Sequence, residues 1–237
     1  MVKPSRFSVV WIIIAATVLY FVTMVTVFMP KQGHAPFKMC VHDSIAHPDN
    51  IISGSIEADP SKDVVMDIGA NIGLHALFFA NAGYKVHAFE PMLANFNVLN
   101  CSASSDPVLR ENLVLNNYGL GDIVTTSCVS ASYGNLGSAK IVADTGSCQP
   151  ENTIQVRRLD EYLNKHQIKP FLIKVDVEGY EFKALESAKE YLKRNPPAHI
   201  FSEFITTHLE AAGSDPKKYL DFFWDLGYKI EWKSERR

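Results

Sequence analysis

Short apolar runs alternate with amphipathic stretches along most of the chain, and this alternation predicts the order of strands and helices. The runs Val64–Ile68, Lys85–Glu90 and Phe171–Val177 are five to seven residues long, and each carries an acid at or near its carboxyl end. Runs of this length are typical of strands buried in a parallel sheet. Segments with helical periodicity, such as Tyr180–Lys193, lie between or after these runs. The pattern therefore predicts an α/β fold, with a mostly parallel twisted sheet covered by helices on both faces.

Further segments complete this order. Strands are predicted at Asn112–Asn116, Ile123–Val129, Ile154–Arg158, His199–Phe204 and Tyr228–Trp232, and helices at Leu93–Ala103, Asp160–His166 and Pro216–Leu226. A turn is expected at Tyr118–Asp122 and a Gly/Ser/Asn-rich insertion at residues 130–153. In parallel sheets, ligands bind outside the carboxyl ends of the strands. The acids at four such ends are therefore expected to share one site: Asp67, Glu90, Asp176 and Glu203.

The most apolar stretch is Phe7–Met29, which contains no charged residue. At ~1.5 Å per residue it would span about 34 Å as a helix, enough to cross a ~30 Å hydrocarbon core. It is longer than the ~7–15-residue core of a signal peptide and lacks an Ala-x-Ala site, so we expect a single-pass anchor. Lys3 and Arg6 precede it, whereas Lys31 and Lys38 follow it. The positive-inside rule thus only slightly favours a cytoplasmic N-terminus and a lumenal domain.

The expected organisation is an N-terminal tail at 1–6, the anchor at 7–29, a stalk and entry segment at 30–60, and one domain at 61–237. Residues 32–237 carry 20 basic and 26 acidic side chains, a formal charge of −6, and show no basic stripe. Nucleic acid is therefore not an expected partner. The four cysteines have no zinc-finger spacing and are expected to be ordinary buried or surface thiols, although a lumen would permit pairing.

The most informative motif is the turn that follows Val64–Ile68. Gly69 and Gly73 lack side chains where the backbone must pass close to a ligand, and Glu90 comes 23 positions after Asp67. An acid at roughly 20 residues' distance binds a ribose hydroxyl in nucleotide-binding α/β units. The motif therefore predicts a nucleoside-containing cofactor. A nicotinamide fingerprint would need glycines at 69, 71 and 74, but positions 71 and 74 are Asn and Leu.

The pattern D-x-G-x-N-x-G resembles the first motif of class I S-adenosylmethionine-dependent methyltransferases. Together with AFEP (88–91), RRLDEYL (157–163) and IKVDVEG (173–179), it makes the chain similar to the FkbM-type methyltransferase family over roughly residues 61–230. The resemblance implies a Rossmann-like fold, S-adenosylmethionine as cofactor, and O-methylation of a hydroxyl on a small molecule or glycan. Two alternatives remain open: a nucleotide-cofactor oxidoreductase, and a membrane-tethered module that binds cofactor without turnover.

The resemblance also implies which residues form the site. The candidates for cofactor binding are Asp67, Gly69, Asn71, Gly73, Glu90, Asn95, Gly119 and Glu178. Among them, Asn95 and Gly119 are expected near the ribose and adenine. Glu178 has an alternative role in the turn after Phe171–Val177 and its backbone amides.

Asp176 is the candidate catalytic residue. It can serve as the general base for the acceptor, or it can bind the cofactor's amino group or cap the following helix. We expect Lys174, an ammonium in an apolar strand, to pair with Glu203. No metal is expected, because no carboxylates cluster in the sequence beyond Asp176 and Glu178. The acceptor is expected to contact residues 130–153 and 205–215.

Overall fold

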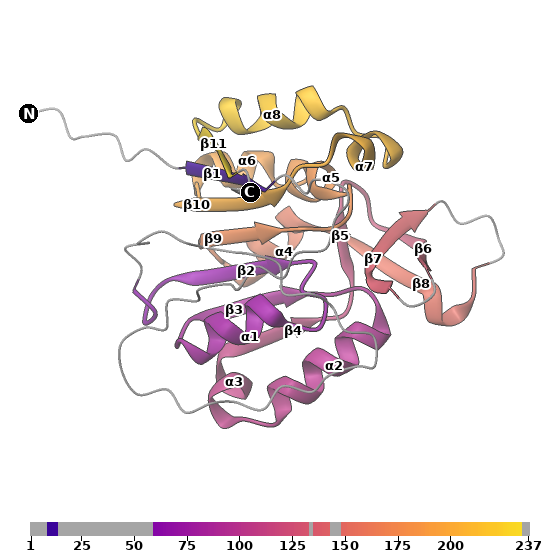
Figure 1. The fold of residues 1–237 in the computed structure, drawn as a ribbon. Coiled ribbons are helices and arrows are strands. Elements are labelled where there is room, and N and C mark those ends of the chain that lie inside the picture. Colours follow the sequence, from indigo (N-terminus) through magenta and orange to yellow (C-terminus); the bar gives the residue numbers. More distant parts are fainter. Residues whose placement is uncertain (1–8, 14–58, 133–134, 143–147, 234–237) are drawn as a thin grey trace, which may run out of the picture.

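A seven-stranded sheet forms the centre of the computed structural model, which describes residues 9–13, 59–132, 135–142 and 148–233 (Figure 1). The strand order is β11-β1-β10-β9-β2-β3-β4, and every pairing in it is parallel. The strands are β1 (Val9–Ile13), β2 (Val64–Ile68), β3 (Lys85–Phe89), β4 (Leu113–Asn116), β9 (Pro170–Val175), β10 (His199–Glu203) and β11 (Lys229–Lys233). The predicted α/β class with a mostly parallel sheet is confirmed.

Two hydrophobic cores lie on opposite faces of this sheet. Successive side chains of a strand point to opposite faces of its sheet. In β2, Val65 accordingly belongs to one core and Met66 to the other. The Val65 core is covered by α1 (Leu74–Asn81), α2 (Leu93–Ser104) and α3 (Pro107–Asn112). The Met66 core is covered by α4 (Leu159–His166), α5 (Glu181–Glu186), α6 (Lys189–Arg194), α7 (Thr206–Ala211) and α8 (Pro216–Asp225).

A second, four-stranded sheet projects from one side of the first (Figure 1). Its order is β5-β8-β6-β7, with β5 (Gly119–Gly121), β6 (Thr125–Ser132), β7 (Asn135–Val142) and β8 (Thr153–Arg158); the 3₁₀ turn η1 (Pro150–Asn152) precedes β8. The turn expected at Tyr118–Asp122 is thus wrong, and the insertion expected at 130–153 contains β7. A side chain on Gly121 would lie 2.8 Å from Val156 Cγ1, so glycine allows β5 to pair closely with β8.

The predicted helix Tyr180–Lys193 is divided into α5 and α6. Ser187 ends α5 because its groups bond elsewhere: its carbonyl accepts from Arg158 Nη2 at 3.0 Å, and its hydroxyl accepts from Leu159 N at 3.1 Å. Both donors belong to the start of α4, which is distant from Ser187 in the sequence. Helical periodicity alone could not reveal this break.

The residues predicted as a transmembrane anchor are described only at 9–13, and there the structure differs from the prediction. Val9–Ile13 form β1, paired in parallel with β10 and β11, rather than a helix. Four of these five residues are Val or Ile, whose branched side chains favour strands, and an apolar run cannot by itself distinguish strand from helix. Across the described ranges, no helix combines the length and apolar character that a membrane crossing requires. The rest of the 7–29 segment lies outside those ranges.

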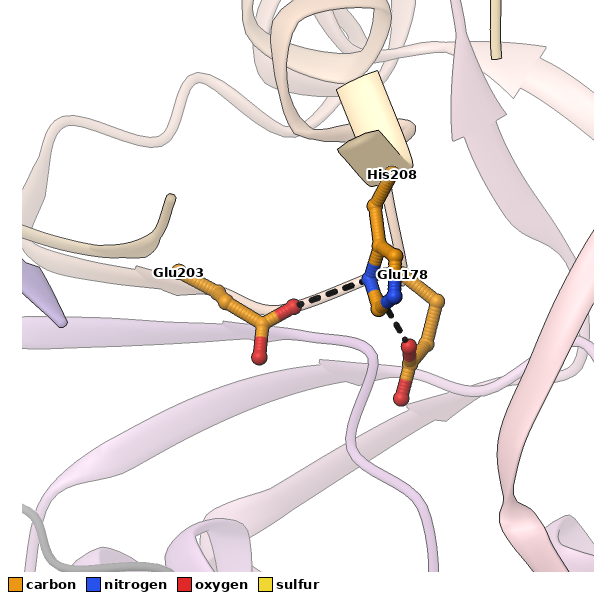
Figure 2. Close-up of side chains that lie close together, drawn as sticks. All are labelled: Glu178, Glu203 and His208. Atoms are coloured by element: carbon orange, nitrogen blue, oxygen red, sulfur yellow. Dashed lines mark ion pairs between the residues drawn. The ribbon is translucent and has the colours of Figure 1, made fainter. Parts of the chain in front are cut away.

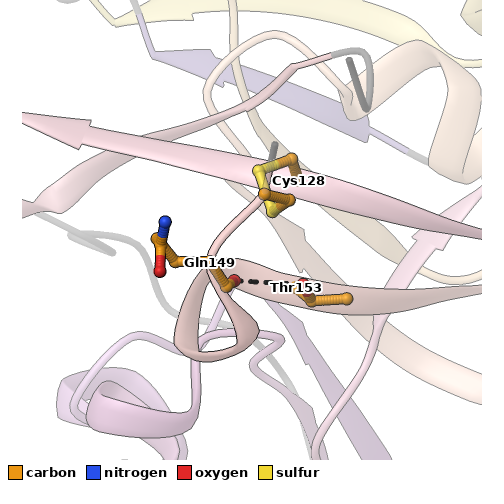
Figure 3. The surroundings of a disulfide bond; sticks show 4 residues. Cys128, Gln149 and Thr153 are labelled. Carbon is orange, nitrogen blue, oxygen red and sulfur yellow. Dashed lines mark hydrogen bonds between the residues drawn. A yellow bond between two sulfur atoms is a disulfide. The ribbon is translucent and has the colours of Figure 1, made fainter. Parts of the chain in front are cut away.

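A disulfide joins β6 to the segment before β8. Cys128 and Cys148 are bonded with their Cα atoms 5.8 Å apart (Figure 3), and Cys101 is disulfide-bonded as well. The expectation of ordinary thiols is wrong for these three cysteines. The pairing of β6 with β8, which brings Cys128 near Cys148, cannot be deduced from cysteine spacing. Beside the bond, Thr153 Oγ1 donates to Gln149 O at 3.1 Å. Disulfides persist in oxidising compartments, in keeping with the lumenal placement that remains a prediction.

Replacing Cys128 and Cys148 together by Ser is expected to lower the free energy of unfolding by about 2–3 kcal/mol. The bond closes a loop with a sequence separation of 20, and restricting such a loop in the unfolded chain is worth about 3 kcal/mol on the entropic account. Urea unfolding of the oxidised wild type and the variant measures the difference. The reduced wild type should be no more stable than the variant, because reduction also opens the disulfide of Cys101. Equal stability of the oxidised wild type and the variant would contradict the prediction.

Candidate functional site

The turn between β2 and α1 is held against the end of β3. Gly69 N and Ala70 N both donate to Phe89 O, at 3.0 and 2.9 Å, and Asn71 N donates to Glu90 Oε2 at 2.8 Å. Gly69 adopts a φ of 80°, and a side chain there would lie 1.9 Å from the carbonyl oxygen of Asp176. The predicted glycine is therefore required for packing β2 against the end of β9, in addition to any approach of a ligand.

Glu90 is a buried acid, 5% exposed, directly after β3. Its Oε2 accepts from Asn71 N, and its Oε1 accepts from Met92 N at 2.9 Å. Burial raises the pKa of Glu90 to about 7, although both backbone hydrogen bonds and the nearby Lys174 cation act in the opposite direction. Each carboxylate oxygen can accept more than one hydrogen bond. The group is thus suited to receive a pair of hydroxyls, such as those of a ribose.

Lys174 and Asp67 form a buried ion pair on neighbouring strands. Lys174 Nζ lies 3.2 Å from Asp67 Oδ1 and donates to Gly69 O at 2.7 Å. Burial alone would lower the pKa of Lys174, but Asp67 and Asp176 outweigh it, so the net shift is upward. The expected pairing of Lys174 with Glu203 is wrong, because β9 pairs with β2 in the register that places Lys174 beside Asp67. Asp67 is fully buried, and its assignment to the cofactor stays a prediction.

Asp176 and Glu178 follow β9, where they meet acids and a histidine from other elements. Lys174 Nζ lies 3.9 Å from Asp176 Oδ2. Ligand atoms of Asp176, Glu181 and Glu203 lie within 4.8 Å of one another, as do those of Glu178, Glu203 and His208. Glu203 belongs to both groups, so Asp176 and Glu203 do share a site, as expected. The sequence argument against a metal counted only Asp176 and Glu178, because the other members come from α5, β10 and α7.

The tight turn after β9 is held by a residue that sequence reasoning missed. Glu181 Oε1 accepts from Val177 N at 2.9 Å and from Gly179 N at 3.1 Å. Burial raises the pKa of Glu181 to about 7, against the effect of these backbone hydrogen bonds. An acid three residues after Glu178, in the first turn of a helix, is the signal that could have identified it.

The remaining predicted cofactor residues are Gly119, Asn95 and Gly73. Gly119 is buried in β5, and a side chain on it would point toward Pro91 Cβ at 3.7 Å. The neighbouring Asn117 donates from Nδ2 to Glu90 O at 2.9 Å. Asn95 is buried on α2, 4% exposed. Gly73 has a φ of 96° and packs closely against Leu99: a Cβ atom on Gly73 would lie 2.3 Å from Leu99 Cδ1.

His208, on α7, is a second residue that the sequence did not single out. Its Nδ1 lies 3.3 Å from Glu178 Oε2 and 3.9 Å from Glu203 Oε2 (Figure 2). The side chains of all three are partly buried, with 17–23% of each exposed. The available signal was weak: a histidine five positions after an acid that ends a strand, within the segment 205–215 already assigned to the acceptor.

A family model and a curated relative agree with the motifs. Residues 67–230 match the model of a family described as the methyltransferase FkbM domain. The chain is also 29% identical over 173 residues to the hexuronic acid methyltransferase AglP of Haloferax volcanii, covering 71% of this chain and 64% of that relative. A solved structure, the methyltransferase FkbM from Methylobacillus flagellatus KT, aligns with 23% identity and a TM-score of 0.41, over 57% of this chain and 31% of the other.

Proposed function

The chain belongs to the family of proteins with a methyltransferase FkbM domain, and on this premise we propose that it is an S-adenosylmethionine-dependent methyltransferase. The proposal rests on the burial and hydrogen bonding of Glu90. A buried carboxylate, held by the backbone amides of Asn71 and Met92 at the end of the second strand of a βαβ unit, suits the ribose of a nucleoside cofactor. Because the chain spans only 64% of the length of its curated relative, that protein's activity is part of the proposal and not its premise.

The residues around Glu90 fit the donor by their chemistry. Asn71, Gly69 and Gly73 lie in the turn that would pass its amino-acid half. Asn95 on α2 and Gly119 on β5 are buried, and we propose that its nucleoside half lies beside them. The bound donor would supply a methyl group on a sulfonium. The protein's own contribution is to align an acceptor oxygen with that methyl group and to remove its proton.

We propose an oxygen of a sugar or other small polyol as the acceptor. The similarity to a hexuronic acid methyltransferase supports an acceptor of this class. Asp176 stands at the carboxyl end of β9, beside the β2–α1 turn, since its backbone N donates to Ile68 O at 3.1 Å. From there it is proposed either to accept the acceptor's proton or to bind the donor's amino group.

Isothermal titration of the full chain tests the cofactor. We expect saturable one-to-one binding of S-adenosylmethionine and S-adenosylhomocysteine and no binding of NADH, because Asn71 and Leu74 occupy the positions at which a nicotinamide fingerprint has glycines. Binding of NADH instead would favour the oxidoreductase. Binding of the donor without transfer of its tritiated methyl group to any of a panel of glycosides would favour the non-catalytic module. Absence of donor binding would contradict the proposed function itself.

A further inference from the structure

The imidazole of His208 faces two carboxylates through the same ring nitrogen. Nδ1 lies 3.3 Å from Glu178 Oε2 and 3.9 Å from Glu203 Oε2. Two negative carboxylates attract a proton on Nδ1 and repel a lone pair there, so the neutral imidazole is stabilised when Nδ1 carries its proton. The lone pair then resides on Nε2. This arrangement, a histidine oriented by a carboxylate, is the one that makes imidazole an effective proton acceptor.

The backbone fixes this geometry. Glu178 has a φ of 54°, and the next residue, Gly179, has a φ of 105°. A side chain on Gly179 would lie 2.3 Å from the carbonyl oxygen of His208, so only glycine lets the turn after β9 contact α7 directly. Glu203 is the last residue of β10, the strand that precedes α7. The histidine is thus positioned over two adjacent strand ends, on the side of the sheet where ligands bind.

We propose that His208 is the general base of the reaction and that the acceptor is a neutral hydroxyl, an inference that rests on the proposed function. As the acceptor oxygen forms its bond to the methyl carbon, the bond from carbon to sulfur breaks and its electron pair stays on sulfur. The hydroxyl proton passes to Nε2 of His208. The products are a methyl ether, S-adenosylhomocysteine and a protonated imidazole beside Glu178 and Glu203.

The charges around His208 favour a hydroxyl over a carboxylate as acceptor. Asp176 lies with Glu203 at this end of the sheet, and Glu178 adds a further acid. Lys174, the cation 3.9 Å from Asp176, is buried and paired with Asp67. An anionic acceptor would meet like charges here. A carboxylate has in addition already lost its proton near pH 7, so it gains nothing from a base, whereas a hydroxyl needs one.

Asp176 is the other candidate base, but it lies beside the β2–α1 turn, where its backbone N donates to Ile68 O at 3.1 Å and Lys174 Nζ lies 3.9 Å from its Oδ2. We assign it to the donor, whose amino group is a cation that an acid beside this turn would attract. His208→Gln and Asp176→Asn should accordingly affect different kinetic constants.

The turnover experiment uses the full chain, tritiated S-adenosylmethionine and two acceptors side by side: p-nitrophenyl β-D-glucoside, which offers only hydroxyls, and p-nitrophenyl β-D-glucuronide, which adds a carboxylate. The neutral glucoside should be the better acceptor. We expect the transferred methyl to survive mild alkali, as an ether does and an ester does not. His208→Gln should lower kcat at least about 100-fold, the range for loss of a general base, with donor affinity within twofold of wild type. Asp176→Asn should chiefly raise the KM of the donor. Glu190→Gln, which changes an exposed acid on α6 outside both segments assigned to the acceptor, is the matched control.

The pH dependence separates a base from a structural histidine. In the wild type, kcat/KM should rise with pH as the imidazole loses its proton. Glu203→Gln and Glu178→Gln should each move the midpoint to lower pH, because each removes a negative charge that favours the protonated ring. Within the described ranges, the charged groups that face the ring include Glu178 from the β9–α5 turn and Glu203 from β10, with Asp176 and Glu181 beyond them.

A measurement without acceptor completes the test. Nitrogen-15 spectra of histidine-labelled protein, assigned with His208→Gln, should show the neutral ring protonated on Nδ1. Protonation on Nε2 would overturn the assignment whatever acceptor is used, as would an alkali-labile product or unchanged kcat in His208→Gln. Activity lost in EDTA and restored by MnCl₂ would also overturn it, since the cluster would then bind a cation. Failure to bind donor would instead count against the proposed function.

Discussion

Lys174→Met is expected to lower the free energy of unfolding by about 3–5 kcal/mol, the cost of removing one partner of a buried ion pair. Lys174 is 4% exposed and Asp67 is fully buried, so no solvent replaces the lost ammonium. The substitution also leaves Gly69 O without its 2.7 Å hydrogen bond from Nζ. Since domains are stable by only about 5–15 kcal/mol, the variant should lose much of its stability. Urea unfolding followed by circular dichroism measures the change.

Two further variants make this result interpretable. Asp67→Leu combined with Lys174→Met removes both charges, and it should recover most of the stability if the uncompensated carboxylate is the cause. Lys189→Met breaks the exposed pair between Lys189 and Asp225, whose atoms are 2.8 Å apart, and should leave the unfolding midpoint within experimental error. A double variant no more stable than Lys174→Met would show that packing, and not charge, causes the loss.

Glu90 should make the ligand-free protein less stable as pH rises toward neutrality. Its pKa rises from 4.5 to about 7 on folding, because burial disfavours the charged form. The folded state therefore holds the proton more tightly, so the stabilisation is fully present below pH 4.5 and is lost as pH passes through 7. The shift corresponds to about 3 kcal/mol. Glu90→Gln should remove this part of the decline, measured by urea unfolding at several pH values between 4.5 and 8.

Donor binding should show the opposite trend, because ribose hydroxyls donate to the ionised carboxylate. As pH rises toward 7, we expect the dissociation constant for S-adenosylmethionine to decrease about tenfold per pH unit, and above pH 7 we expect it to stay constant. Glu90→Gln should weaken binding at pH 8 and abolish the pH dependence. Glu181→Gln is the matched control. The pKa of Glu181 is also raised to about 7, but its carboxylate accepts from the β9–α5 turn and not from the β2–α1 turn, so this variant should keep the pH dependence of donor binding. A pH dependence that survives in Glu90→Gln would exclude Glu90 as the group responsible.

Local sequence patterns predicted the segment from β2 to β3 well. Val64–Ile68 is a strand with the predicted bounds, and the turn after it brings Asn71 and Glu90 into contact. These residues lie within 27 positions of one another, in one βαβ unit, so short-range rules suffice. The same rules failed at Ser187, where Arg158 and Leu159 end a helix from outside its own sequence.

The partners of Lys174 and His208 depended on the order of the strands. Lys174 pairs with Asp67 because β9 lies next to β2, although more than 100 residues separate the two in sequence. His208 meets Glu178 because α7 packs on the turn after β9, with Gly179 in contact with its backbone. Neither contact has a local periodicity or motif. Predicting either contact requires the order of the strands in the sheet.

The place of β1 has a practical consequence for preparing the protein. A segment that looks like a membrane anchor is commonly deleted to obtain a soluble domain, and a boundary near residue 30 would remove Val9–Ile13. Within the described part of the chain, β11 is joined to the sheet only through β1. Such a deletion would leave the C-terminal strand without its neighbour and expose the edge of β10, whose last residue is Glu203. Recombinant fragments intended for assays of this site should therefore keep the N-terminal residues.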